Sequence, residues 1–490
     1  MASLTSALNY ARSSLTSVAG QTAVVSQNIT NARNVDYTRK STVVASQSSG
    51  AISISRYDRA VDSALLEKLL SSSSSSAACK TILDGIKKLS ETVGDPDSQT
   101  SPAALLNAVQ VSLQVYEQNP SNQNLGANAV EAARSLATSL NSANSAIETV
   151  RRQADGGIAE SVNKINNLLN QFKIVNDAIT RGDGTKLELV DNLDTRDSII
   201  KQLSEEIGIK TVTRANNDVA LYTEGGVSLF ETSARTVSFK PTPGLTAGMS
   251  GAAVYVDGVD ISSSSSPMPS QSGNIYGLVN VRDRIAVTYQ NQVDEFARGL
   301  ITAFSESDQS AIPSLPDATG VFSYSGSPAV PVVGTILPGL AGSIRINSAI
   351  DPYQGGNISK LRDGGINGAA YSYNTTASAG FSDRIGALVD KIDGSMQFNA
   401  NAMLSTNTSL KSFGSTSSGW LYSLYKSATE TSNLQSAAGQ RVKDALQSST
   451  GVSIDNEMAH MLELERSYQA SAKLISTVDQ MFQILLGVVK

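Results

Sequence analysis

LTSALNYARSSLTSVAGQTAVVSQNI, residues 4–29, carries the pattern that decides the fold, and MLELERSYQASAKLISTVDQMFQILLGVV, residues 461–489, repeats it near the other end of the chain. In both stretches apolar residues recur at alternating steps of three and four, with mostly polar residues between them. This seven-residue period places one narrow apolar stripe along an α-helix. The N-terminal stripe consists of Leu4, Leu8, Ala11, Leu15, Val18, Val25 and Ile29, and the C-terminal stripe of Met461, Leu464, Tyr468, Ile475, Val478, Phe482, Leu485 and Val489.

Two interpretations of these stripes stay open. The two helices either pack on the body of the same chain, or they pair with each other and with copies of themselves. We favour the second interpretation, because a narrow stripe on a long polar helix gives little surface to a globular core. Such helices are marginal alone in water, and each Leu or Ile that assembly buries contributes about 1.5–3 kcal/mol. The pattern therefore predicts paired coiled-coil helices that become ordered on joining a polymer.

Composition argues against several classes of function. The chain of 490 residues contains one cysteine, Cys79, and one histidine, His460, which excludes an intramolecular disulfide and a cysteine-based zinc site. Lys and Arg total 38 against 44 Asp and Glu, and no basic run marks a nucleic-acid partner. The sequence contains no run of 18 apolar residues, so no membrane-spanning helix is predicted. Residues 1–29 lack the pattern of a cleaved secretory signal. We expect no catalytic residue, no metal and no cofactor.

The stretch NITNARNVDYTRK, residues 28–40, follows the N-terminal stripe directly. It resembles the signature of flagellar rod, hook and hook-associated proteins, in which Asn-Ile-x-Asn precedes Gly-Tyr-Thr-Arg-Gln. The matching residues are Asn28, Asn31, Tyr37, Thr38 and Arg39. Asp36 stands where the family has Gly, and Lys40 stands where it has Gln.

Three later stretches narrow the resemblance to the family of the first hook-associated protein. They are RRQ at 151–153, LDTRD at 193–197 and GVSID at 451–455, and they occur in the family's order. The resemblance implies a non-enzymatic structural component of the bacterial flagellum, a self-assembling adapter at the hook–filament junction. It also implies export without cleavage by the flagellar type III apparatus, and hence a location outside the cell.

The same resemblance implies the partners. These are copies of the chain itself, the hook protein, a neighbouring hook-associated junction protein, and an export chaperone. The chaperone of this family engages the C-terminal helix, so the stripe from Met461 to Val489 is both a self-assembly surface and the candidate chaperone site. No nucleic acid and no membrane insertion are expected.

The fold class predicted is α+β and multidomain, with paired terminal helices, a discontinuous long-helix bundle and inserted β-rich outer domains. The serine run 71–76 keeps the apolar phase of its neighbours, which favours a continuous helix over a linker. The predicted domains are a terminal coiled-coil core (1–40 and 450–490), a helical domain (41–186, 274–310 and 376–449), a β-rich outer domain (187–273) and a variable insertion rich in Gly, Pro and Ser (311–375). Within this insertion, short strands are predicted at Val332 and Val333 and at Ile344 and Ile346.

Alternative functions remain. Another flagellar axial protein, of the hook or distal rod, would share the N-terminal signature, and flagellin would share the paired terminal helices. Residues 311–375 are compatible with an adhesive or carbohydrate-binding module, and a hydrolase would have to use His460. The acidic residues Asp191, Asp194 and Asp197 invite a metal interpretation, but their helical spacing favours capping and pairing with Arg196.

Overall fold

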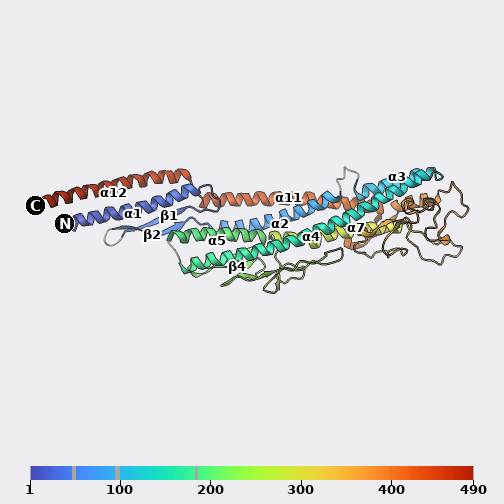
Figure 1. Cartoon of the computed structure of the whole chain (residues 1–490), viewed down its shortest axis with the longest axis horizontal. Helices are drawn as coiled ribbons and strands as arrows, with labels where there is room; N and C mark the ends of the chain where they lie inside the picture. The colour runs from blue at the N-terminus through green and yellow to red at the C-terminus, as the bar shows by residue number, and fades with distance from the viewer. Residues whose placement is uncertain (1, 47–50, 94–99, 183–185, 489–490) are drawn as a thin grey trace.

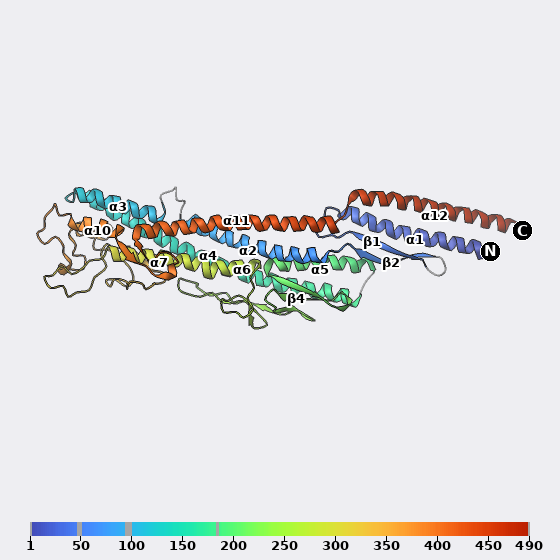
Figure 2. The ribbon, with the colours of Figure 1, turned by 180° about the vertical axis from the view of Figure 1, so that it is seen from behind.

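The computed structural model describes residues 2–46, 51–93, 100–182 and 186–488. The molecule is a long rod with both chain ends at the same extremity (Figure 1), and the view from behind shows the same order of elements (Figure 2). Three parts follow one another along the rod: a pair of terminal helices, a helical body with β-strands along one side, and a region of loops. The mainly helical architecture with small antiparallel sheets agrees with the predicted fold class.

The terminal helices, α1 (Ala2–Asn31) and α12 (Ile454–Val488), lie side by side and run antiparallel, projecting beyond the body (Figure 1). Between them lies a small apolar cluster in which Val18, Val25 and Leu464 are buried and Ile29 and Met461 are partly buried. Further out, the hydroxyl oxygens of Ser14 and Ser471 are 3.1 Å apart. We call α1 and α12 the terminal pair.

A β-hairpin connects the terminal pair to the body. Its strands, β1 (Lys40–Ser46) and β2 (Ile52–Arg59), are antiparallel, with Lys40 opposite Arg59 and a bulge between Val43 and Val44. The hairpin packs against α1 where Gly20 leaves room for Ile54. A β-carbon on Gly20 would lie 2.6 Å from Cδ1 of Ile54, so a larger residue here would displace the end of that side chain.

The body is a bundle of long antiparallel helices centred on α4. Buried residues recur along α4 at steps of three and four, including Leu140, Ile147, Ile158 and Ile165, so one face is buried for its whole length. The serine run lies inside α2, where buried Ser74 donates to Ser272 at 2.6 Å, and the prediction of a continuous helix is confirmed. The helices are α2 (Ser63–Val93), α3 (Pro102–Gln118), α4 (Gln123–Arg181), α5 (Lys186–Glu206), α6 (Gly273–Asn280), α7 (Ala286–Ala303), α10 (Asp383–Asp393) and α11 (Leu410–Thr450).

Two three-stranded antiparallel sheets lie along α4 (Figure 1). They share an apolar core with the second half of that helix, in which Phe172 meets Phe230 edge to face at 4.9 Å. Residues 186–206, most of which the sequence grouped with the β-rich domain, form α5 and pack on α2 and α4. The strands are β3 (Ile209–Thr213), β4 (Val219–Thr223), β5 (Ser228–Phe230), β6 (Val237–Ser238), β7 (Tyr255–Val256) and β8 (Val259–Asp260).

Two buried arginines fasten the loop between β6 and β7 to the body. Arg151 of α4 donates to the carbonyl oxygen of Thr246 at 2.8 Å, and Arg282 donates to that of Ala252 at 2.8 Å. Arg282 also pairs with Asp155 at 2.6 Å and lies in a π-helical turn, Val281–Ile285, between α6 and α7. The carbonyl groups of this loop and the carboxylate of Asp155 therefore satisfy the two buried guanidinium groups.

Residues 311–375 form mostly loops at the end of the rod opposite the chain ends (Figure 1). The strand predicted at Val332 and Val333 is wrong, because both residues lie in an exposed loop that no neighbouring strand pairs with among the described residues. The regular elements here and just beyond are β9 (Phe322–Ser323), α8 (Leu340–Ser343), β10 (Arg345–Ile346), α9 (Ser359–Asp363), β11 (Ser395–Gln397) and β12 (Asn407–Ser409). Within the described part of the chain, no helix is both long and apolar enough to cross a bilayer.

A buried carboxyl group in the body predicts a dependence of stability on pH. Asp294 accepts from the backbone N–H groups of Gly339 and Ala341 at 2.9 Å each and from Gln290 at 3.0 Å, yet burial raises its pKa to about 6. Between about pH 4 and pH 6, the carboxyl group of Asp294 therefore keeps its proton in the folded chain but has lost it in the unfolded chain, where its pKa is ordinary. Lowering the pH from 7 to 5 should raise this group's contribution to the free energy of unfolding by about 1.4 kcal/mol.

Urea unfolding at pH 5 and pH 7 tests this expectation when the parent chain is compared with Asp294→Asn. The variant is less stable at both pH values because the N–H groups of Gly339 and Ala341 contact different carboxyl oxygens of Asp294, and the NH₂ group that replaces one oxygen in asparagine cannot accept. Its change between the two pH values should be smaller than the parent's. Equal changes in parent and variant would refute the assignment to Asp294.

Candidate functional site

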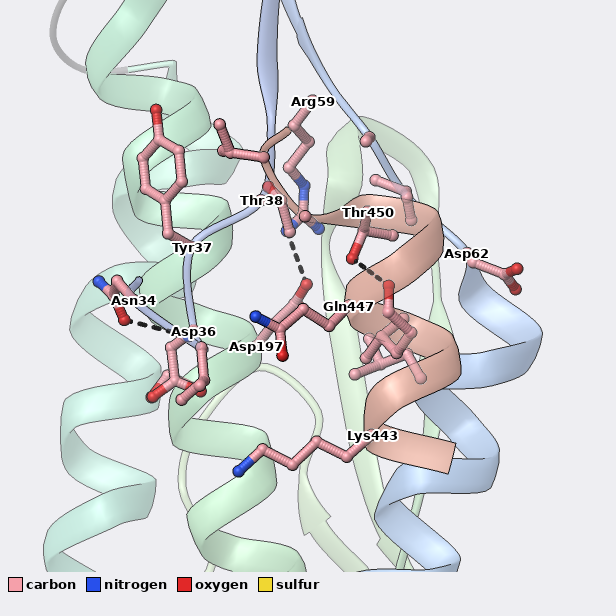
Figure 3. Close-up of a pocket in the computed structure, with 18 of the residues that line it drawn as sticks. Asn34, Asp36, Tyr37, Thr38, Arg59, Asp62, Asp197, Lys443, Gln447 and Thr450 are labelled. Carbon is pink, nitrogen blue, oxygen red and sulfur yellow. Dashed lines mark hydrogen bonds and ion pairs between the residues drawn. The ribbon is translucent and has the colours of Figure 1, made fainter. Parts of the chain in front are cut away.

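The candidate site is the joint where the terminal pair meets the body, and Figure 3 shows the side of it formed by residues 36–38, Arg59 and Asp197. We define the joint as Asn28, residues 36–40, Arg59, three aspartates of α5 and Glu457 of α12. The chain reaches it through a turn in which the N–H of Asn34 bonds the carbonyl oxygen of Asn31 at 2.8 Å and Asp36 N–H bonds the side chain of Asn34 at 3.1 Å. The three aspartates are Asp191, Asp194 and Asp197.

Asn28 lies at the centre of the joint and is fully buried. Its amide nitrogen donates to the carbonyl oxygen of Lys40 at 2.8 Å and to Oε2 of Glu457 at 3.0 Å. Its amide oxygen accepts from the N–H of Lys40 at 3.0 Å and from the hydroxyl of Tyr37 at 2.8 Å. Both donors and both acceptor positions of the amide are used, so this side chain ties α1, the signature turn and α12 together.

Glu457 brings the C-terminal segment into the joint. It lies in the first turn of α12 and is fully buried, although it carries a carboxylate. Arg39 donates from Nε to its Oε1 at 2.6 Å, while Oε2 accepts from Asn28. The backbone adds a second link, since the N–H of Arg39 bonds the carbonyl oxygen of Thr450 at 2.8 Å.

The acidic residues of α5 bind the signature turn and the hairpin. Asp194 accepts from the hydroxyl of Thr38 at 2.6 Å and from Nη1 of Arg59 at 3.0 Å. Asp197 pairs with Arg59 at 2.7 Å, as the close-up shows (Figure 3), and Asp191 pairs with Lys40. Two motifs about 155 residues apart in sequence thus lie in direct contact.

The predicted pairing of these aspartates with Arg196 is wrong. Arg196 lies on the opposite side of α5, where Nη1 donates to Oδ1 of Asn176 at 3.0 Å and to the carbonyl oxygen of Asn217. Among the described residues, no group of three or more Asp, Glu, His or Cys side chains is placed to hold a metal ion. The aspartate side chains face Lys40, Arg59 and Thr38 instead.

Both departures from the family signature form ion pairs with α5. Asp36 pairs with Lys201 and accepts from Ser198 at 3.4 Å, and it is not among the residues with a positive φ. Lys40 is buried to 1% exposure and reaches Asp191 and Asp194. Asp36 and Lys40 therefore add three ion pairs between the signature turn and α5.

Tyr37 serves the joint as a hydrogen-bond donor. Burial raises the pKa of its phenol, and the negative charges of Asp191, Asp194 and Glu457 raise it further. The Lys40 ammonium lies 4.3 Å from the centre of its ring. The phenol thus stays protonated at physiological pH and can keep donating to Asn28.

A small cavity of about 60 Å³ lies beside the joint, between the turn, α2 and the end of α11 (Figure 3). Its apolar lining includes Val35, Val61, Leu66, Leu446 and Val452.

The predicted stripes form the contact between α1 and α12. Ala11, Val18, Val25, Leu464 and Val478 are buried in it. Other stripe residues, namely Leu4, Leu8, Leu15, Ile29, Met461, Ile475 and Phe482, are half-buried. Tyr468 is 48% exposed, and the side chain of Leu485 and all of Val489 lie outside the described residues. The terminal helices thus pair with each other, while their coiled-coil character and their pairing with copies stay predictions.

Two predicted or notable residues stand apart from the joint. The side chain of Asn31, a signature residue, donates to the carbonyl oxygen of Gln27 within α1, at 2.9 Å. His460, which a hydrolase would have to use, is 42% exposed on α12 and faces Glu463 at 3.6 Å. Sequence reasoning missed Glu457 as a joint residue, although a signal was present: it continues the apolar stripe one step before Met461.

Comparisons with known proteins find similarities in the helical body and in the C-terminal segment. A family model described as the flagellar hook-associated protein FlgK helical domain matches residues 86–320, and a model of the C-terminal region of flagellar basal body rod FlgEFG proteins matches residues 445–488. Flagellar hook-associated protein 1 of Salmonella typhimurium is 23% identical over 317 residues, which are 62% of this chain and 56% of that protein. The match thus spans little more than half of that relative.

Two further similarities extend over more of the chain. Flagellar hook-associated protein 1 of Bacillus subtilis is 20% identical over 410 residues, covering 78% of this chain and 75% of that protein. The solved structure of the flagellar hook junction protein FlgK from Burkholderia pseudomallei superimposes with a TM-score of 0.57 at 13% identity, over 78% of this chain and all of that one. This second likeness concerns the fold.

The joint predicts a specific effect of Asn28→Asp. The new carboxylate has nearly the same shape but faces Glu457 and cannot donate to it or to Lys40, which should cost about 1–3 kcal/mol. Amide exchange should become faster in β1 and β2, whereas α4 keeps its protection. Asn31→Ala is the matched control, because it removes only a contact within α1. Equal exchange in the two variants would contradict the central role of Asn28.

Proposed function

Because the chain belongs to the FlgK-type family of flagellar hook-associated proteins, we propose that it is a structural adapter of the hook–filament junction. Copies of the chain assemble through their terminal pairs into a layer between hook and filament. The role is mechanical and not enzymatic. The helical body forms the shell around the terminal pairs, and the β-sheets and the loops of residues 311–375 face outward.

A second apolar stripe on α12 is the observation that carries this proposal. The stripe consists of Leu474, Met481 and Ile484, which follow steps of seven and three residues and are 58%, 51% and 68% exposed. Leu462, which is 54% exposed, lies on the same helix outside this spacing. Since the terminal pair projects beyond the body (Figure 2), no other part of the described chain covers this stripe. Exposed apolar patches of this kind mark protein interaction sites.

The two stripes of α12 support different parts of the proposal. The stripe facing α1 completes the terminal pair within one chain, and the exposed stripe receives a neighbouring copy. Each exposed Leu or Ile that becomes buried contributes about 1.5–3 kcal/mol. Several such residues in each copy supply enough free energy to favour a closed layer over separate chains.

The remaining partners follow from the family resemblance. The hook protein lies on one side of the layer, and a neighbouring hook-associated junction protein lies on the other. The chain reaches the outside of the cell through the flagellar type III apparatus. Before export, a chaperone covers the apolar surface of α12 and so prevents premature assembly.

Among axial proteins, the hook-associated assignment is favoured over a hook or distal-rod component. The C-terminal match is to a region named for basal body rod FlgEFG proteins. The helical match over residues 86–320 is to a model named for the hook-associated protein FlgK, and it covers α3 to α7 of the body.

Deletion of the gene in its native host tests the proposed function. We expect hooks without filaments in electron micrographs, with flagellin shed into the medium, and restoration of filaments by the parent gene. The double variant Leu474→Asp, Ile484→Asp should fail to restore filaments, because two carboxylates would be buried in the contact between copies. Ile174→Asp on α4, where Ile174 is 69% exposed, is the matched control and should restore them. Normal filaments in the deletion strain would overturn the proposal.

A further inference from the structure

The apolar contact between α1 and α12 leaves their relative register weakly defined. Among the described residues, the buried cluster consists of Val18, Val25 and Leu464, with two partly buried residues at its edge. Further out, Ala11 and Val478 are also buried. Because the stripes repeat every seven residues, sliding one helix by seven residues again places small and aliphatic side chains opposite each other. Such a slide moves the helices by about 10 Å and changes the apolar contact little.

Glu457 interrupts this repeat with a buried charge. It precedes Met461 by four residues and Leu464 by seven, so it occupies the next position of the same stripe. Its side chain is only 1% exposed. A single buried polar residue in an apolar stripe is known to specify register in paired helices.

The donors to Glu457 are fixed by the rest of the molecule. Asn28 is held by its three hydrogen bonds to Lys40 and Tyr37, and Arg39 is held by the backbone bonds of its N–H to Thr450 and of its carbonyl oxygen to Ala60. The N–H of Thr38 and its hydroxyl both face Asp194 of α5. The position of Glu457 is therefore fixed relative to the body as well as relative to α1.

We propose that the contact of Glu457 with Asn28 and Arg39 is a register pin, which selects one alignment of α12 against α1 from several that the apolar stripes allow. In an alignment shifted by seven residues, Glu457 leaves both donors, and Asn28 keeps a buried N–H without a partner. Discrimination comes from the cost of these unsatisfied groups in the wrong alignment, as in other cases of specificity. The exposed stripe of α12 is thereby presented at one fixed height relative to the body.

Disulfide formation in the isolated full-length chain measures the register. In a Cys79→Ser background, Ser14→Cys with Ser471→Cys reports the native alignment, because the two hydroxyl oxygens are 3.1 Å apart. Ala7→Cys with Ser471→Cys, and Gln21→Cys with Ser471→Cys, report alignments shifted by seven residues in either direction. A shift of about 10 Å exceeds the reach of a disulfide, so each pair reports one alignment.

With Glu457 present, the native pair should cross-link at least about tenfold faster than either shifted pair. Glu457→Leu should reduce this ratio to within about threefold, because leucine fits the stripe in every alignment. Glu457→Gln, which can still accept from Arg39, should keep an intermediate ratio. Glu463→Leu is the matched control, since it removes the same charge from a side chain that is 77% exposed, and should leave the ratio unchanged.

Two results would overturn the register pin: an unchanged ratio in Glu457→Leu, or equal cross-linking of native and shifted pairs with Glu457 present. Urea unfolding of the body, followed by the single tryptophan Trp420, shows whether each variant is folded. The measurement uses single chains in solution and is independent of the hook–filament role. A result that refutes the hook–filament role would therefore not refute the register pin, and a result that refutes the register pin would not refute the hook–filament role.

Discussion

The fully satisfied amide of Asn28 is the contact on which the geometry of the terminal pair depends. One side chain holds the end of α1, the start of β1 and, through Glu457, the first turn of α12. Because the group is buried, each of its hydrogen bonds has to be made or its loss costs the full desolvation of a polar group. Small displacements of any one segment are thus resisted by all three, which explains how two long helices with a sparse apolar contact keep a defined orientation.

Polar anchoring recurs elsewhere in the body and serves the same end. Arg151 and Arg282 hold the loop between β6 and β7 through backbone carbonyl groups, much as Asp194 holds the signature turn. Buried charges of this kind add little net stability compared with apolar packing, but they penalise alternative arrangements strongly. The loop between β6 and β7 and the terminal pair are both attached to the body by contacts that fix their positions. The stability of the fold comes instead from the apolar face of α4 and its neighbours.

The helices of the fold could be predicted from the sequence, whereas most contacts of the joint could not. The period of the terminal stripes and the helix through residues 71–76 were predictable, because helical periodicity is local and survives runs of small residues. The contact between residues 36–40 and α5 was not, since ion pairs between segments far apart in sequence leave no periodic signal. Arg196 was assigned to its nearest neighbours in sequence, whereas the helix directs it away from Asp194 and Asp197. The strand expected at Val332 and Val333 failed because β-branched residues favour strands only where a partner strand is available.

Placing both chain ends at one extremity of the rod gives the molecule two covalent routes between the terminal pair and the body, residues 32–39 and residues 451–453. Tension along the rod is therefore divided between two backbones that run in opposite directions. The antiparallel contact of α1 and α12 experiences no sliding force when both helices are pulled equally, but it is sheared when only one is loaded. A neighbouring molecule that binds both helices would thus transmit a pulling force without shearing the contact between them. A neighbour that binds α12 alone would load the contacts of the joint.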